Sequence, residues 1–122
     1  MPASDGPSVL LLHGFATSFA TTWAGNGWTD LLADAGRTVI GVDMLGHGEA
    51  DKPTDPEAYR NLEDLVAEQL PGEPVDAVGF SMGARVLLVL AARDPQRFRR
   101  LVLAGVGRKL FEQDSARGRE IV

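Results

Sequence analysis

The sequence predicts an α/β fold in which a mostly parallel sheet of about four strands is flanked by helices. Short apolar runs of strand length alternate along the chain with longer segments of helical periodicity. Strands that alternate with helices pair in parallel through right-handed crossovers. The run at 38–42, Thr-Val-Ile-Gly-Val, is β-branched and lacks polar alternation, as expected of a parallel strand covered on both faces.

Four segments have the length and composition of strands, and three segments between them have helical patterns. The predicted strands are 8–13, 38–42, 75–79 and 98–104. The predicted helices are 22–35, 59–70 and 82–93. The first helix ends at Gly36 and the second at Pro71-Gly72, which are ordinary stop signals. The third is apolar almost all round, which indicates burial against the centre of a sheet. Trp23 and Trp28 are expected in the core.

Composition narrows the class of protein. The 122 residues fit one domain (1–122), and no apolar run approaches the roughly 20 residues of a membrane span. The net charge of −5 disfavours a nucleic-acid partner. The absence of cysteine excludes disulfides and thiolate metal sites and fits a cytoplasmic location. No metal-binding cluster, phosphate-cradling Gly-Lys loop or dinucleotide fingerprint is present, so neither a metal nor a cofactor is expected.

The segment Gly79-Phe80-Ser81-Met82-Gly83 carries the sharpest chemical signal. This G-x-S-x-G pattern lies between a predicted strand and a predicted helix. A serine on such a turn has a strained backbone, and glycines are needed on both sides because side chains there would meet the neighbouring strand and helix. The turn also places Ser81 at a helix N-terminus, where free N–H groups favour a developing negative charge. The alternative is a glycine-rich turn with an incidental N-cap serine.

A second signal, His13-Gly14-Phe15, directly follows the first predicted strand. Acyl transfer needs two N–H donors aimed at the oxyanion of its tetrahedral intermediate. The backbone N–H groups of Phe15 and Met82 are candidates, with Gly14 allowing the chain to turn. His13 is expected to be a buried, hydrogen-bonded loop histidine rather than a proton-transfer group. Phe15 and Met82, together with Phe19, are candidates for an apolar pocket wall.

Taken together, three blocks resemble the α/β-hydrolase superfamily in order and spacing. They are VLLLHGF at 9–15, GVDMLGHG at 41–48 with Asp51-Lys52-Pro53, and VGFSMG at 78–83. The resemblance implies that the strand before His13 lies between the strands ending at Val42 and Gly79. It also implies that Asp43 and His47 are structural residues of a nearby loop, so His47 is not expected to be the catalytic base.

The chain departs from the family pattern in ways that bear on function. In the family the nucleophile is followed by an acid and then a histidine, whereas both histidines here, His13 and His47, precede Ser81. The opening hairpin and the last strands of the fold are also absent. We therefore expect a partial fold that is nearly inactive alone, with 107–122 as the start of a cap or linker. The predicted strand 98–104 would be an exposed edge through which a second chain or copy could pair.

Two functions follow from these features. The first is a serine hydrolase of ester-like bonds (ester, thioester, lactone or activated C–C bond) acting on a small molecule, with Ser81 as nucleophile. An aspartate at position 81 would instead indicate a dehalogenase or epoxide hydrolase. The alternative is a non-catalytic binding or interaction module that keeps the pocket but lacks the triad.

Overall fold

The computed structural model describes residues 6–105 and shows one four-stranded parallel sheet. The strands are β1 (Val9–Leu12), β2 (Val39–Val42), β3 (Val75–Phe80) and β4 (Phe98–Ala104), in the spatial order β2-β1-β3-β4. The chain thus moves from β1 to one side for β2 and then to the other side for β3 and β4. Because the strand order reverses there, the carboxyl ends of β1 and β3 flank a crevice of the kind in which open α/β sheets bind ligands. The predicted fold class and the central position of β1 are confirmed.

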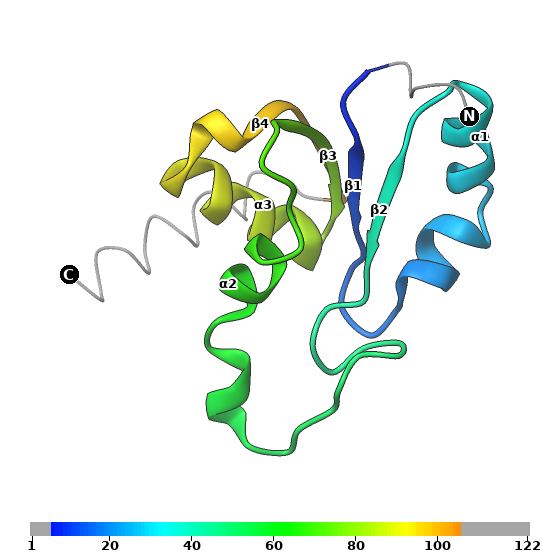
Figure 1. Ribbon diagram of the computed structural model, residues 1–122. Coiled ribbons are helices and arrows are strands. Elements are labelled where there is room, and N and C mark those ends of the chain that lie inside the picture. The colour runs from blue at the N-terminus through cyan, green and yellow to red at the C-terminus, as the bar shows by residue number, and fades with distance from the viewer. Residues whose placement is uncertain (1–5, 106–122) are drawn as a thin grey trace.

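The two faces of the sheet are covered by different helices. In Figure 1, α2 (Leu62–Ala67) and α3 (Met82–Arg93) lie on one side, and α1 (Trp28–Asp34) with the preceding π-helix (Ala20–Ala24) lies on the other. The buried β1 serves both layers, since successive strand residues point to opposite faces. Leu10 and Leu12 join the core under α2 and α3, whereas Val9 and Leu11 pack with Trp23. Continuous apolar sequence in β1 is therefore explained by burial on both sides.

The third predicted helix is confirmed, and its two ends coincide with those of α3. It buries Ala84, Val86, Leu87 and Leu90 against the sheet, but Val89 is 39% exposed. The helix is therefore covered on one broad face rather than all round. This face anchors the helix whose first turn follows Ser81.

The first predicted helix is wrong as a single element. It is divided between the π-helix Ala20–Ala24 and α1, because Gly27 adopts a left-handed φ of 82°. The core assignment of its tryptophans holds for Trp23, which is buried, but not for Trp28, which is 42% exposed. Helical periodicity alone did not reveal that the break at Gly27 rotates Trp28 away from the interior.

The second predicted helix, 59–70, is shorter in the structure: only α2 lies within it, and a 3₁₀ turn (Pro56–Tyr59) precedes α2. Asn61 lies between them with φ −111° and ψ 37°, which is not helical. Asp55 begins the 3₁₀ turn by accepting a hydrogen bond from the Glu57 amide. The apolar stripe of the predicted helix still packs against the core, because Val66 of α2 is buried there.

Among the described residues, β4 pairs with β3 alone, so its outer edge is open. A second chain or copy on this edge stays a prediction. The expected start of a cap or linker at 107–122 lies outside the described residues. Between residues 6 and 105, no helix has the length and apolar content to cross a membrane.

Candidate active site

The turn between β3 and α3 holds Ser81 in a conformation that L-residues seldom adopt, with φ 54° and ψ −107°. Its flanking glycines leave no room for side chains. A Cβ on Gly79 would lie 2.7 Å from the backbone N of Ala84, and one on Gly83 would lie 2.7 Å from the carbonyl carbon of Leu12 in β1. Real Cβ atoms essentially never approach this closely. The sequence pattern G-x-S-x-G is thus required by close packing of the turn against the helix and the neighbouring strand.

Backbone hydrogen bonds fix this turn at both ends. The Ser81 amide donates to the carbonyl oxygen of Ala104 at the end of β4 (2.9 Å), and the Arg85 amide donates to the Ser81 carbonyl oxygen (3.2 Å). The Ser81 side chain makes no capping hydrogen bond to the helix. An incidental N-cap serine would be expected to make that bond, so the geometry gives no support to the capping alternative.

Strain at Ser81 predicts that Ser81→Gly stabilises the chain by about 1 kcal/mol, because glycine adopts a positive φ without steric cost. Urea unfolding followed by tryptophan fluorescence would measure the change. Ser81→Ala keeps a Cβ, so it is the matched control and should leave stability nearly unchanged. A destabilised glycine variant would show that the turn is not strained in solution.

The loop after β1 lies directly against this turn. A Cβ on Gly14 would come within 2.9 Å of the Phe80 ring and 3.3 Å of the Phe80 carbonyl oxygen. Gly14 is buried, while the next residue, Phe15, is 74% exposed. The structure therefore brings the His13-Gly14-Phe15 segment beside the residue that precedes Ser81.

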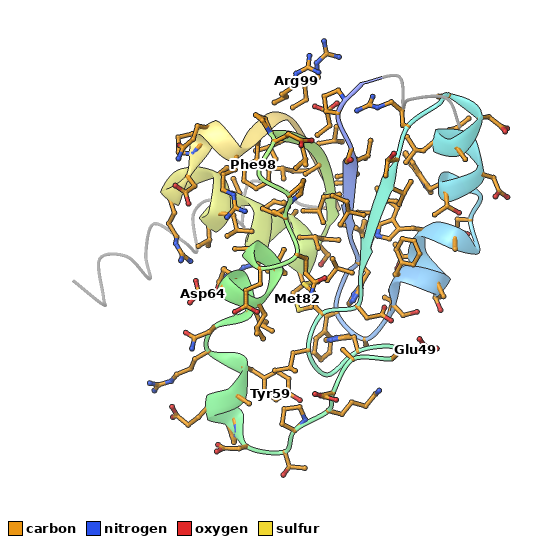
Figure 2. All side chains as sticks on the ribbon, viewed as in Figure 1. Glu49, Tyr59, Asp64, Met82, Phe98 and Arg99 are labelled. Atoms are coloured by element: carbon orange, nitrogen blue, oxygen red, sulfur yellow. The ribbon has the colours of Figure 1, made fainter. Side chains whose placement is uncertain are left out.

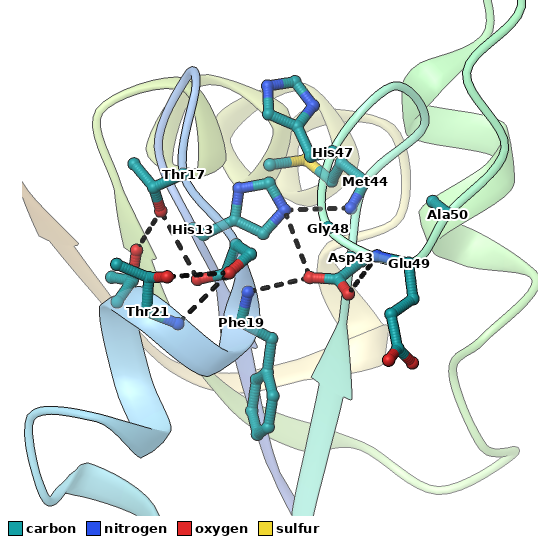
Figure 3. A network of polar contacts seen from close by, with 12 residues as sticks. His13, Thr17, Phe19, Thr21, Asp43, Met44, His47, Gly48, Glu49 and Ala50 are labelled. Atoms are coloured by element: carbon teal, nitrogen blue, oxygen red, sulfur yellow. Dashed lines mark hydrogen bonds and ion pairs between the residues drawn. The ribbon is translucent and has the colours of Figure 1, made fainter.

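His13 is a fully buried connector between two loops (Figure 3). Its Nε2 accepts a hydrogen bond from the Met44 amide (2.9 Å), so the neutral ring carries its proton on Nδ1, which donates to the Gly14 carbonyl oxygen (2.8 Å). Burial is the main influence that lowers the pKa of His13, and the nearby His47 acts in the same direction. With both nitrogens engaged and the neutral form favoured, His13 holds the loop and is unsuited to proton transfer.

Asp43, at the end of β2, ties the same two loops together. Its carboxylate accepts hydrogen bonds from the amides of Phe19 (2.8 Å) and Glu49 (3.0 Å), as Figure 3 shows. Burial opposes ionisation of this carboxyl, but the amide hydrogen bonds from Glu49 and Phe19 outweigh it and lower its pKa. Gly48 passes so close to the Asp43 carboxylate that a Cβ there would overlap it.

Phe15 and Met82, the two candidate oxyanion donors, line one apolar cavity of about 530 Å³ at the carboxyl end of the sheet. The side chain of Met82 lies between the sheet and the loop that carries Tyr59 (Figure 2). Ser81 itself is half-buried and is not among the residues that line this cavity, although it precedes Met82 directly. Phe19 is not part of this wall, because its ring packs against Gly41 of β2.

Sequence reasoning missed other parts of the cavity. His47 lines it and contacts both Phe15 (ring centroids 5.7 Å apart) and His13 (5.0 Å). Tyr59 and Leu62 also line it, from the segment that leads into α2. The available signal was the Gly46-His47-Gly48 turn in the loop that follows β2, because ligand-binding loops are expected at the carboxyl ends of strands. Within residues 6–105, no three His, Asp or Glu side chains gather as a metal site would require.

The sequence profile of the alpha/beta hydrolase fold matches residues 7–117. The chain belongs to the α/β-hydrolase family. An uncharacterized protein of Mycobacterium tuberculosis is 41% identical to this α/β-hydrolase over 109 residues, covering 86% of this chain and 30% of that protein. The 2-hydroxymuconate semialdehyde hydrolase of Pseudomonas sp. (strain CF600) is 36% identical over 106 residues, covering 82% of this chain and 36% of that protein.

Solved structures agree with this family assignment. The 2-hydroxy-6-oxo-6-phenylhexa-2,4-dienoate hydrolase from Rhodococcus sp. strain RHA1 is 30% identical, with a TM-score of 0.65 over 80% of this chain and 37% of that one. A thioesterase domain from the curacin biosynthetic pathway is 26% identical, with a TM-score of 0.67 over 83% of this chain and 37% of that one. This α/β-hydrolase chain thus spans about a third of the length of the proteins that it matches.

Proposed function

We propose that this chain supplies the nucleophile and the oxyanion hole of a serine hydrolase that acts on ester-like bonds of small molecules. Ser81 is the nucleophile, and the backbone N–H groups of Phe15 and Met82 stabilise the oxyanion. The observation that carries the proposal is the strained φ of Ser81 between two glycines that cannot carry a side chain. Such strain persists where function uses it.

The position of the turn supports this role electrostatically. Ser81 directly precedes the 12-residue helix α3 and makes no capping bond to it. The partial positive charge and the free N–H groups at this helix end favour an anion in the same place. The Met82 amide belongs to that helix end, and the Gly14–Phe80 contact brings the loop carrying the Phe15 amide against the turn. Two donors from different elements would then meet the developing negative charge.

Neither histidine of the chain supports a role as general base. His13 has both ring nitrogens in hydrogen bonds. His47 hydrogen-bonds through Nδ1 to the Leu45 carbonyl oxygen (3.1 Å), but it precedes Ser81 in the chain, whereas the catalytic histidine of the family follows the nucleophile. A serine hydroxyl needs a base to remove its proton near neutral pH. We therefore propose that the acid and the histidine of the triad come from hydrolase sequence outside these 122 residues.

The substrate class rests on the residue type at position 81 and on the apolar cavity that Met82, the next residue, lines. A serine nucleophile suits esters, thioesters, lactones and activated C–C bonds. The relatives include a semialdehyde hydrolase, a dienoate hydrolase, a thioesterase and a haloalkane dehalogenase, so their names alone do not narrow this class. The cavity wall of Phe15, Leu45, Leu62 and Met82 favours an apolar group next to the reacting carbonyl.

A fluorophosphonate probe tests the proposal, because it reacts covalently with an activated serine. In a fusion that continues this chain with the remaining sequence of a related hydrolase, we expect labelling of Ser81 and complete loss of labelling in Ser81→Ala. The 122-residue chain alone should be labelled far more slowly, since it lacks a base. A fusion that binds small apolar esters but is never labelled would favour the non-catalytic binding module instead.

A further inference from the structure

The cavity that Phe15 and Met82 line is apolar apart from two side chains. Among its described lining residues, only His47 and Tyr59 carry a nitrogen or oxygen atom in the side chain. His47 belongs to the loop after β2, and Tyr59 ends the 3₁₀ turn that precedes α2. Both are half-buried. In apolar sites of this kind, a few polar groups decide which ligands are accepted.

The ring hydrogen of His47 is already used within its own loop. Nδ1 lies 3.1 Å from the Leu45 carbonyl oxygen, and a carbonyl oxygen only accepts, so the neutral ring carries its hydrogen on Nδ1. Nε2 is then left with a lone pair. Between residues 6 and 105 nothing donates a hydrogen bond to Nε2, and this atom is not among the buried ones that lack a partner. The Nε2 atom of His47 is therefore an accessible acceptor.

The Tyr59 hydroxyl is engaged in the same way. It donates its hydrogen to the Pro53 carbonyl oxygen (2.6 Å), which leaves only lone pairs on the phenolic oxygen. The Tyr59 ring also packs against Gly46, where an added Cβ would lie 2.8 Å from the ring carbon Cε1. Its position is thereby tied to the turn that carries His47. Neither side chain has a hydrogen left to donate, so the polar side chains of this wall offer acceptors alone.

We propose that this cavity selects substrates that carry a hydroxyl group on the apolar part next to the reacting carbonyl. The hydroxyl would donate its hydrogen to Nε2 of His47 or to the Tyr59 oxygen. An ether of the same size has no hydrogen to donate, and a carboxylate would bring its own lone pairs against these acceptors. A site built around such acceptors rejects the analogue that lacks the donor, because its polar groups are then left unpaired. The inference rests on the proposed hydrolase function and narrows its substrate class.

Titrations of the 122-residue chain with phenol and anisole test the proposal, because anisole replaces the hydroxyl of phenol with a methyl ether. Phenol should bind about fivefold more tightly at about pH 8, where an unperturbed imidazole is neutral. The methyl resonance of Met82, followed by NMR, reports binding in this cavity. His47→Leu should lower the ratio of the two affinities to about twofold or less. Glu49→Leu, an exposed position of the same loop, is the matched control and should leave the ratio unchanged.

Equal affinities for phenol and anisole in the unsubstituted chain, or no binding of either, would overturn the proposal, and this comparison does not depend on how His47→Leu folds. An unchanged ratio in a folded His47→Leu chain would also refute it. So would tighter binding of benzoate than of phenol, because a carboxylate needs donors. Shifts of the Trp23 and Trp28 indole resonances without a shift at Met82 would place the ligands in a different cavity and contradict the proposal. Since these titrations do not involve the Ser81 hydroxyl, failed fluorophosphonate labelling would refute the nucleophile without changing their result.

Discussion

Gly83→Ala is expected to lower the free energy of unfolding by about 3 kcal/mol or more, which is a large part of the roughly 5–15 kcal/mol typical of a small domain. The added Cβ would lie 2.7 Å from both the carbonyl carbon and the Cβ of Leu12. Leu12 is fully buried in the central strand, so it cannot move aside. Relief would require α3 to shift away from β1, and this shift would open the core that α3 shares with the sheet.

Gly72→Ala provides the control for this substitution. Gly72 is exposed, has no left-handed φ and has no atom within 4 Å of the place that an added Cβ would take. Alanine there should be neutral or slightly stabilising, because it restricts the unfolded chain. Urea unfolding of both variants, followed by circular dichroism, makes the comparison. Similar stabilities for Gly83→Ala and Gly72→Ala would show that α3 does not approach β1 this closely in solution.

The elements of the sheet and the order of its strands were predicted on different grounds. Continuous apolar runs and the alternation with helical segments predicted the parallel strands and α3, which begins and ends where it was predicted. The central position of β1 was implied by the resemblance to the α/β-hydrolase superfamily and not by local patterns. The G-x-S-x-G pattern also predicted the two close glycine contacts that the structure shows, at Gly79 and Gly83. Residue type and spacing decide these features, so no tertiary information was needed.

The parts that could not be predicted depend on contacts between distant segments. The break at Gly27 has the same helical periodicity on both sides, and only the direction of the chain after the break decides that Trp28 faces outward. Likewise, His47 and Tyr59 reach the cavity because the loop after β2 folds back over the end of the sheet. Tyr59 stays in place by donating its hydroxyl hydrogen to the Pro53 carbonyl oxygen (2.6 Å), a bond that no periodicity reveals.

His13→Gln is expected to cost about 2–4 kcal/mol of stability and to remove a pH dependence that the unsubstituted chain should show. The imidazole joins the Gly14 carbonyl to the Met44 amide in a site with no exposed surface. Glutamine cannot reproduce both bonds in that geometry, and each buried partner left unpaired costs about 1–3 kcal/mol. Loss of these bonds should also loosen the loop that carries Phe15.

The pH dependence has a defined sign. Burial lowers the pKa of His13 below its usual 6.5, so around and below pH 6.5 the unfolded chain binds a proton that the folded chain does not. Stability is therefore fully present above pH 6.5 and falls as the pH decreases toward the folded-state pKa. The slope of this loss cannot exceed about 1.4 kcal/mol per pH unit, because one proton is bound.

Urea unfolding at several pH values between about 5.5 and 7.5 measures this slope, which should vanish in His13→Gln and persist in His47→Gln. Asp43 does not interfere, because its pKa is lowered and its contribution is lost only as the pH falls below about 3.8. A proton resonance of the His13 ring that titrates at or above pH 6.5 in the folded chain would refute the explanation. In that case the ring would be accessible to protons, and the expectation that His13 takes no part in proton transfer would be wrong.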